Sequence, residues 1–368
     1  MRKKMFKNME WAVLICSIIL CIIGCIALFS ATNESQSGEL TKQITWFFIS
    51  LVVMVIFALI DYETLAKFSP VFYGIFLILL VAVLFTKPIN GASSWFDIKV
   101  FSFQPGEFAK IFVVIFLAYL ISKMQQRGRD EINKPLKLIG VLTAVAIPVL
   151  LIIKQPDYGT ALAFLVATVL ILFTAGIDKK YIIGTVLIIA ILLPIMYFFI
   201  LPDHAKTRID IFLNPNKDPR GSGYNVIQSK LAIGAGKLLG MGILKGNQTQ
   251  LGFLYPKTTD FIFSVIGEEM GFIVAGSVII LYVVLITKTI YIAKTAKDDL
   301  GSYIAMGIAG IFLFHMLENI GMTMGLLPIT GVPLPFVSYG GSSLLMNFIC
   351  IGILLSISGR RQKAIFVQ

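Results

Sequence analysis

The residues of this 368-residue chain best suited to chemistry are carboxylates that lie within or beside long apolar stretches. Glu107 and Lys110 are three residues apart, a spacing that places both on one helix face, where they can pair. Asp157 and Asp260 each directly precede a further apolar stretch. An ionised group in hydrocarbon costs at least about 2.5–3.5 kcal/mol, so such groups usually mark a pathway or a site. Desolvation beside lipid raises the pKa of a carboxyl group, which suits it to act as a general base on a hydroxyl.

Each of these residues also has a plainer interpretation. Glu107 and Lys110 could form a purely structural pair, and Asp157 and Asp260 could simply cap the helices that follow them. His315 and Glu318 are also three residues apart, which suggests a metal site. A di-iron bundle, however, needs two Glu-x-x-His copies in the opposite order, so metal is not favoured there.

Composition excludes an ordinary soluble domain. The chain is 57% apolar and 14% charged, with a mean hydropathy of +0.88, whereas soluble domains are near 25% charged. The formal charge of +11 is better explained by anionic lipid and membrane orientation than by nucleic acid. The four cysteines lie in apolar runs without metal-ligand spacing, and we expect them to be small buried hydrophobes.

The apolar runs have the length of membrane spans, and they must be helices because no backbone group can stay unpaired in lipid. We therefore expect an all-α polytopic membrane protein of about ten spans. The expected spans are 11–31, 44–60, 69–86, 108–122, 138–153, 159–176, 181–201, 261–287, 301–325 and 339–357.

Basic residues predict the orientation. Eighteen Lys and Arg lie on the side of the N-terminus, and the short loops of the opposite side carry four. The positive-inside rule then makes both termini cytoplasmic and the loop 202–259 extracellular. Within this loop 202–223 is turn-rich, while 224–244 is amphipathic and either lies in the membrane interface or caps the bundle. We find no internal repeat, which disfavours an inverted-repeat transporter, and expect one domain, 1–368.

This orientation gathers the polar residues at the outer ends of the spans. Glu268 and Glu269 are expected about two turns into the eighth span, and 327–343 forms an outer loop rich in Pro and Gly. An outer pocket of this kind suits a lipid-borne polar substrate. The tail of the substrate would stay in the bilayer while its headgroup meets Asp260, Glu107 and Lys110.

Four segments that contain these residues carry a family resemblance. They are QPGEFAK (104–110), QPDYGTA (155–161), TTDFIFSVIGEEMG (258–271) and GLLPITGVPLPFVSYGGSS (325–343). Over essentially its whole length the chain resembles the SEDS family of bacterial cell-wall polymerases, named for shape, elongation, division and sporulation. The segment 234–261 is more similar to the rod-elongation (RodA) branch than to the division (FtsW) branch. Gly106 and Asn225 depart from the family, which usually has Ser and often has Gln at these positions.

The resemblance implies an inverting peptidoglycan glycosyltransferase that polymerises lipid II on the outer face of the bacterial cytoplasmic membrane, for elongation and rod shape. Asp260 would be the catalytic base that deprotonates the acceptor sugar, with undecaprenyl diphosphate as the leaving group. A role in binding the substrate is implied for Glu107, Lys110, Asp157, Arg208, Glu318, Ser338 and Ser342. Lys110 or Arg208 would stabilise the charge of the diphosphate.

The resemblance also implies a partner, a class B penicillin-binding protein that acts as the transpeptidase. A divalent cation, Mg²⁺ or Mn²⁺, could assist the reaction, although the sequence contains no complete ligand set. Three alternatives stay open. They are a flippase that moves lipid II across the membrane, a non-catalytic scaffold that recruits the transpeptidase, and a polymerase of the division or sporulation branch.

Overall fold

The computed structural model describes residues 2–32, 38–87, 93–97, 102–185, 187, 203–214, 217–218 and 221–361. Within these ranges nine helices are long and apolar enough to cross a membrane, which confirms the predicted all-α polytopic architecture. The seventh expected span, 181–201, falls for the most part outside the described residues. The nine helices are α2 (Trp11–Thr32), α3 (Glu39–Leu59), α4 (Tyr62–Val83), α5 (Pro105–Gln125), α6 (Pro135–Ile153), α7 (Tyr158–Ala175), α12 (Ile262–Lys294), α13 (Asp299–Thr323) and α14 (Gly341–Gly359).

Shorter elements complete the described part of the chain. The amphipathic stretch predicted in the long loop forms helix α10 and the turns that follow it. Two short strands pair antiparallel, with Phe96 opposite Phe103. These elements are α1 (Arg2–Asn8), β1 (Phe96–Asp97), β2 (Ser102–Phe103), the 3-10 helix η1 (Arg129–Asn133), α9 (Asp203–Leu213), α10 (Ser222–Ala235) and α11 (Asn247–Gln250).

The helices begin where the sequence supplies capping residues. Asp61, Asp157 and Asp298 each accept a hydrogen bond from a backbone N–H in the first turn of α4, α7 and α13, which satisfies donors that have no partner within the helix. Pro105 and Pro135 open α5 and α6, where the missing N–H of proline costs nothing. Local chemistry therefore fixes where five of the spans begin.

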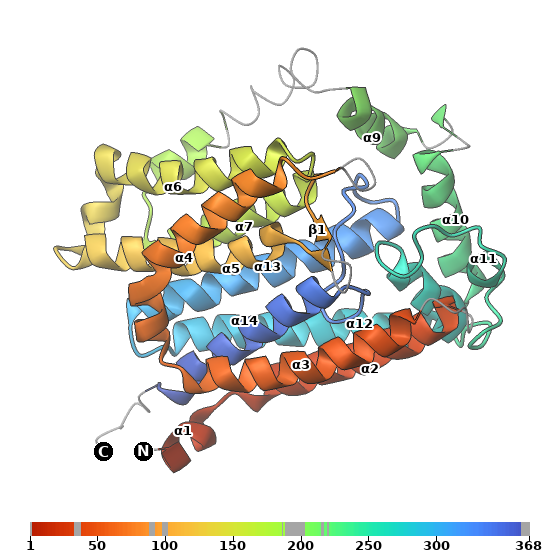
Figure 1. The fold of residues 1–368 in the computed structure, drawn as a ribbon, viewed down its shortest axis with the longest axis horizontal. Coiled ribbons are helices and arrows are strands. Elements are labelled where there is room, and N and C mark those ends of the chain that lie inside the picture. Colours follow the sequence, from red (N-terminus) through yellow and green to blue (C-terminus); the bar gives the residue numbers. More distant parts are fainter. Residues whose placement is uncertain are drawn as a thin grey trace.

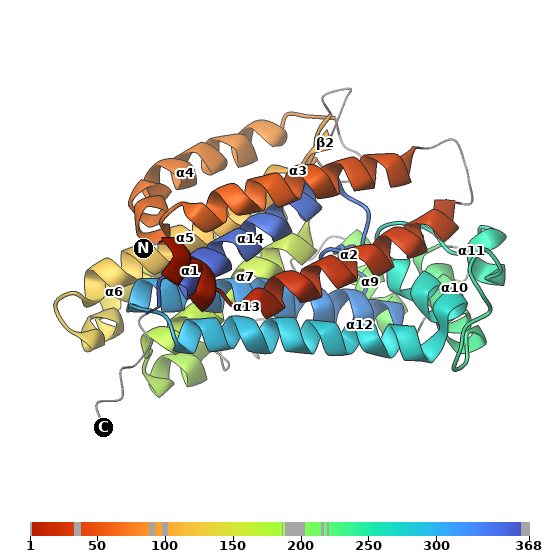
Figure 2. The same cartoon turned by 90° about the horizontal axis from the view of Figure 1, so that it is seen from below.

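Helices α5, α13 and α14 form the buried centre of the bundle. Helix α3 packs on α14, α7 packs on α13, α4 packs on α5, and α2 lies along α12 (Figures 1 and 2). Glycine allows close approach of α13 to α7, because an added Cβ on Gly310 would lie 2.7 Å from the Cα of Ala167. Small residues at such contacts are the usual means of packing helices in lipid.

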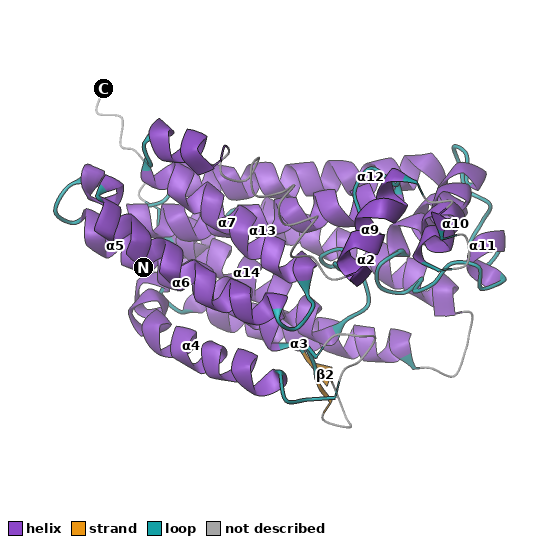
Figure 3. Ribbon diagram, turned by 90° about the horizontal axis from the view of Figure 1, so that it is seen from above, coloured by secondary structure: helices purple, strands orange, loops and turns teal. Residues whose placement is uncertain are grey.

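The two ends of the bundle differ. Helices α9, α10 and α11 gather at one end, whereas α1 and the end of α14 lie at the other (Figures 1 and 3). We call the first the loop end. The segments before α5, α7, α12 and α14, which carry the four family-like motifs, all lie at the loop end.

Helix α12 is interrupted at Gly271, whose φ of 76° and ψ of −177° are not helical. The backbone of the long loop enters this kink, since the N–H of Phe272 donates to the carbonyl of Lys237 and the N–H of Met241 to that of Glu268. The segment 272–294 is long enough by itself to cross about 30 Å of hydrocarbon. Glu268 and Glu269 lie about two turns into α12, as expected. Both precede the kink, however, and their carboxylates hold the long loop.

The side chains of Glu268 and Glu269 bind the long loop that precedes α12. The Glu268 carboxylate accepts hydrogen bonds from the backbone N–H groups of Gln248 and Thr249, and so caps α11 in place of a local residue. Glu269 accepts from the N–H of Gly246 and from the Gln250 side chain. The loop is thus fastened to α12 by two buried carboxylates.

The segment 327–340 between α13 and α14 does not stay at the surface, and we call it the re-entrant loop. Val337 packs on α2 so closely that an added Cβ on Gly24 would lie 2.5 Å from its carbonyl oxygen. The hydroxyl of Tyr282, in the spanning part of α12, donates to the carbonyl of Pro335. The outer loop expected from the sequence is therefore a segment that descends into the bundle.

Candidate functional site

A cavity of about 670 Å³ opens at the loop end of the bundle. This volume falls in the range of sites that hold small ligands or cofactors. All four motif segments contribute to its wall. Its lining residues lie within 31–32, 94–95, 102–107, 156–160, 255–260, 330–333 and 339–343, and Glu39 and Arg208 complete it.

Asp260 lies in this wall, two residues before the first residue of α12. Its interpretation as a helix cap is wrong, because Phe261 occupies the cap position and no side chain caps the helix. The amide of Asn319 donates to the backbone carbonyls of Asp260 (3.0 Å) and Val332 (2.8 Å). An added Cβ on Gly331 would lie 3.3 Å from Oδ2 of Asp260. The aspartate is therefore held against the re-entrant loop with its carboxylate in the cavity.

Burial is the largest influence on the Asp260 carboxyl group. It raises the pKa of Asp260 to about 6, although a hydrogen bond from the Thr259 side chain and the positive charge of Arg208 act in the opposite direction. A carboxylate with a pKa near neutrality is still ionised at pH 7 and is a stronger base than an ordinary aspartate. These are the properties required of a general base.

Glu107 and Lys110 form the predicted ion pair, with 2.8 Å between Nζ and Oε1. Nζ of Lys110 also lies 2.8 Å from Nε2 of His315, which comes from α13. The three residues are each 2% exposed. Glu107 lines the cavity, whereas Lys110 and His315 lie behind it. Sequence reasoning treated His315 only as a possible metal ligand and did not connect it to Lys110.

Asp157 has two functions in the structure. Its carboxylate caps α7 by accepting from the N–H of Thr160 (3.0 Å), and it also accepts from the Gln104 side chain (3.0 Å). It lines the cavity as well, and burial raises its pKa. Asp157 therefore both caps α7 and lines the cavity, so the two interpretations of this residue do not exclude each other.

Two cations face the cavity. The Arg208 guanidinium, on α9, donates to the carbonyls of Ile329 and Thr330 (3.3 and 3.4 Å). The Lys257 ammonium donates to the carbonyl of Thr249 (2.9 Å), and burial lowers its pKa. Lys257 was not identified from the sequence, although its position three residues before Asp260 is a signal that could have found it. Two cations in one cavity can balance a multiply charged anion.

Besides Lys110, three of the predicted binding residues do not line the cavity. The Glu318 carboxylate accepts from the Thr330 hydroxyl (2.7 Å). The Ser338 hydroxyl donates to the carbonyl of Thr259 (2.7 Å), and that of Ser342 donates to the carbonyl of Ser102 (3.0 Å). These side chains hold the segments that form the wall.

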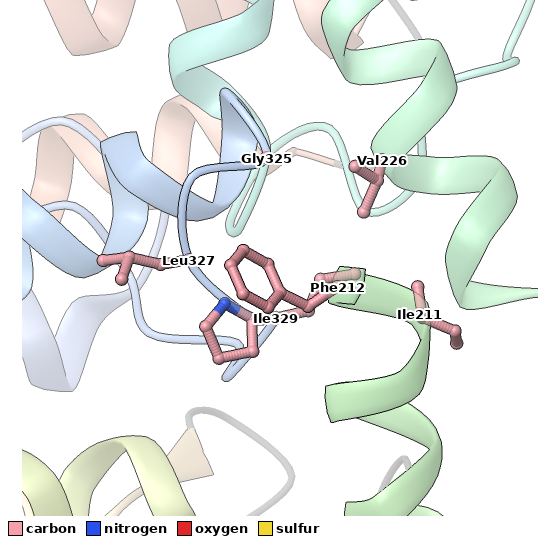
Figure 4. Close-up of a pocket in the computed structure, with 7 residues that line it drawn as sticks. Ile211, Phe212, Val226, Gly325, Leu327 and Ile329 are labelled. Carbon is pink, nitrogen blue, oxygen red and sulfur yellow. The ribbon is translucent and has the colours of Figure 1, made fainter. Parts of the chain in front are cut away.

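A second and much smaller pocket, of about 10 Å³, lies between α9, α10 and the start of the re-entrant loop (Figure 4). Ile211 and Phe212 of α9 meet Leu327 and Ile329 there, and Val226 of α10 closes the far side. Its lining is apolar and its volume is too small for a ligand. The pocket marks the contact that packs α9, and with it Arg208, onto the re-entrant loop.

The cavity carboxylates do not form a metal site. Among the described residues no three side chains of His, Cys, Asp or Glu converge as ligands would. Glu107 is paired with Lys110 and Asp157 caps α7, so neither donor set suits Mg²⁺ or Mn²⁺, which prefer several free oxygens.

Comparison with known proteins agrees with this architecture. Residues 10–363 match the FtsW/RodA/SpoVE family, which is described as cell cycle protein. The chain is 37% identical over 357 residues to the peptidoglycan glycosyltransferase MrdB of Escherichia coli, covering 96% of this chain and 95% of that protein. It is 32% identical over 439 residues to the peptidoglycan glycosyltransferase RodA of Treponema pallidum, covering 98% and 100%.

Solved structures share the fold. One of them superposes with a TM-score of 0.82 at 28% identity, over 95% of this chain and 97% of that one. Its description is "Structural coordination of polymerization and crosslinking by a peptidoglycan synthase complex". The rod shape determining protein RodA of Thermus thermophilus gives a TM-score of 0.72 at 24% identity, over 96% and 98%, which concerns the fold alone. With a family match that spans nearly the whole sequence, the chain belongs to the FtsW/RodA/SpoVE family of multi-pass bacterial inner-membrane proteins.

Proposed function

We propose that this protein is a peptidoglycan glycosyltransferase that polymerises lipid II on the outer face of the cytoplasmic membrane, for cell elongation and rod shape, and that residues 1–368 act as one domain. The observation that carries the proposal is the position of Asp260, a carboxylate with a raised pKa in a large cavity that also holds two cations. The names of the MrdB and RodA relatives support the same activity.

In the proposed reaction Asp260 removes the proton from a hydroxyl of the acceptor sugar. The hydroxyl oxygen then forms a bond to the anomeric carbon of the donor. The bond from that carbon to the undecaprenyl diphosphate breaks, and the diphosphate leaves with the electron pair. Attack opposite the leaving group inverts the configuration at the anomeric carbon.

Arg208 and Lys257 supply positive charge for the leaving diphosphate, since fixed cations in a cavity with little water stabilise developing negative charge. Glu107 and Asp157 face the same cavity and bind the polar headgroup. Lys110 acts through Glu107, because it lies behind that residue. The roles proposed for Glu318, Ser338 and Ser342 become roles in shaping the wall.

The orientation follows from the distribution of charge. The connections at the end opposite the cavity carry most of the Lys and Arg that flank the spans, and by the positive-inside rule that end is cytoplasmic, as are both termini. The cavity then opens toward the cell wall. The peptidoglycan synthase complex among the similar structures supports a class B penicillin-binding protein as the partner.

A polymerase is favoured over a lipid II flippase because a flippase needs a polar route through both leaflets. The described lining of the cavity comes from the loop end only. At the opposite end, contacts such as Lys288 with Glu10 (3.0 Å) and Tyr62 with Asp298 (2.8 Å) join the helices.

The test is glycan synthesis by the purified full-length protein with labelled lipid II, alone and with its transpeptidase partner. We expect Asp260→Ala and Asp260→Asn to lower the rate by about 10²–10⁴-fold, the range that general-base catalysis contributes. Asp178→Asn removes an exposed carboxylate at the opposite end and serves as the control. Equal polymer from wild type and the Asp260 variants would contradict the base role. Translocation of lipid II in liposomes without any polymer would favour the flippase.

A further inference from the structure

The buried imidazole of His315 has no part in the reaction described so far, although it lies within hydrogen-bond distance of Lys110. Its two ring nitrogens have different partners. Nδ1 lies 3.0 Å from the backbone carbonyl of Pro333, and Nε2 lies 2.8 Å from Nζ of Lys110. At 2% exposure the ring has little access to bulk water.

The partner of Nδ1 fixes the position of the proton. A carbonyl oxygen can only accept, so Nδ1 must carry the hydrogen and donate it to Pro333. A neutral imidazole then presents an unprotonated Nε2 to Lys110, as an acceptor. The doubly protonated ring is disfavoured, because an amine is a much stronger base than an imidazole and the ammonium would otherwise lose this acceptor.

We propose that His315 is a positioning residue of the cavity: as the neutral, Nδ1-protonated tautomer it accepts a hydrogen bond from Lys110 and so holds the ammonium against Glu107. The inference rests on the proposed glycosyltransferase function for its effect on rate. The tautomer and the contact do not depend on that function.

This chain of contacts joins two parts of the wall. Pro333 belongs to the re-entrant loop and lines the cavity, as Glu107 does on α5. His315 and Lys110 connect the two from behind through hydrogen bonds of 2.8–3.0 Å. Two of the three ammonium hydrogens are thereby committed to Glu107 and His315. Each acceptor limits the freedom of a long lysine side chain, whose rotamers would otherwise move the charge.

The neighbours of His315 on α13 support this division of roles. Glu318 contacts Thr330 and Asn319 contacts Val332, so residues at i, i+3 and i+4 on one helix face all hold the re-entrant loop. Of these three residues, His315 is the one that lies within hydrogen-bond distance of Lys110 among the described residues. A structural role would be shared by the whole face, whereas a positioning role toward the ion pair belongs to His315.

Kinetics give the first test, with the full-length protein, its transpeptidase partner and lipid II. We expect His315→Leu to lower kcat/KM by about 10–100-fold, the usual effect of losing a residue that orients a functional side chain. His315→Gln, which can again offer an oxygen to Lys110, should recover to within a few-fold of wild type. Phe314→Leu, which alters the neighbouring ring at 6.1 Å but no acceptor, is the packing control.

A double-mutant cycle shows whether His315 acts through Lys110. The variant His315→Leu/Lys110→Met should be no slower than Lys110→Met alone, because Nε2 of His315 has no ammonium to position once Lys110 is replaced. If the fold-losses in kcat/KM of the two single variants multiply in the double variant, the proposal is overturned. A His315→Gln variant as slow as His315→Leu would also overturn it.

The tautomer can be observed without turnover. The sequence contains only two histidines, His204 and His315, so His204→Asn leaves one imidazole for nitrogen-15 NMR of histidine-labelled protein in nanodiscs. We expect a neutral ring protonated on Nδ1 at neutral pH, with an Nε2 signal that shifts in Lys110→Met. A ring protonated on Nε2, or on both nitrogens, would overturn the proposal. Wild-type protein without polymerase activity would instead contradict the proposed function, and the NMR result would still decide this one.

Discussion

Four carboxylates line the cavity, those of Glu39, Glu107, Asp157 and Asp260. Glu107 is paired with Lys110, and Asp157 is occupied by the first turn of α7. Glu39 belongs to the first turn of α3, and Asp260, among the described residues, neither forms an ion pair nor caps a helix. Burial raises the pKa of this carboxyl group to about 6, which suits Asp260 to take a proton from a substrate. Environment rather than residue type separates the base from its neighbours.

The pH dependence of polymerisation follows from this environment. Because burial raises the pKa of Asp260 to about 6, and a base acts only when ionised, kcat/KM should fall about tenfold per pH unit below that value and level off above it. Initial rates between about pH 5 and 8 measure the profile, and thermal stability at each pH serves as the control for unfolding. A flat profile down to pH 5 with folded protein would show that Asp260 is not the base.

The buried ion pair gives a second prediction at this scale. Glu107→Gln and Lys110→Met should each reduce polymerisation and lower the melting temperature without unfolding the bundle, because each leaves a buried charge without its partner, at a cost of about 3–5 kcal/mol. The double variant should melt at a higher temperature than either single variant, since no isolated charge remains. Thermal unfolding in detergent gives the melting temperatures of the wild type, the two single variants and the double variant. Equal melting temperatures for all four proteins would show that the pair does not contribute to stability.

At the scale of elements, hydropathy predicted the nine described spans with bounds that differ by at most seven residues from those observed, because length and apolar character are local properties of a sequence. The cluster of motifs at one end was also predictable, since alternating spans bring every second connection to the same side. The kink of α12 and the descent of the re-entrant loop were not predictable. Both depend on backbone contacts with distant segments, such as Lys237 with Phe272, that leave no periodic signal. The contact of His315 with Lys110 was missed for the same reason.

The kink of α12 leads to a prediction about substitutions of Gly271. Gly271 has a positive φ, and an added Cβ would lie 2.2 Å from the backbone nitrogen of Gly240. Gly271→Ala should therefore abolish activity and sharply reduce the yield of folded protein, because backbone must move to make room. Gly276→Ala, on the same helix with nothing within 4 Å of an added Cβ, should be tolerated or slightly stabilising. Size-exclusion profiles and thermal unfolding compare the two; similar behaviour of both variants would contradict the role given to the kink.

At the scale of the whole molecule, the proposal depends on which end of the bundle faces the wall. The chain's own cysteines are favourable for a labelling test, since Cys16, Cys21 and Cys350 are buried and Cys25 is only partly exposed. Leu251 lies exposed at the loop end, and Arg127 lies exposed at the opposite end.

With an impermeant thiol reagent on intact cells, Leu251→Cys should be labelled strongly. Arg127→Cys should react only after the membrane is permeabilised, because the positive-inside rule makes its end cytoplasmic. Gel-shift labelling with and without detergent distinguishes the two positions. The reverse pattern would place the cavity in the cytosol, away from the wall, and would remove the basis of the proposed function.

The anchoring of the re-entrant loop extends the functional unit well below the membrane surface. Tyr282 lies eleven residues beyond the kink, roughly 16 Å along the helix axis, yet it holds Pro335, and the same loop supports Asp260 through Asn319. A hydrophobic compound that enters from the lipid side and displaces Pro335 would disturb the base without occupying the sugar site. Such an inhibitor would be noncompetitive with lipid II. The apolar interior around Tyr282 and Pro335 is therefore a candidate binding site for antibiotics.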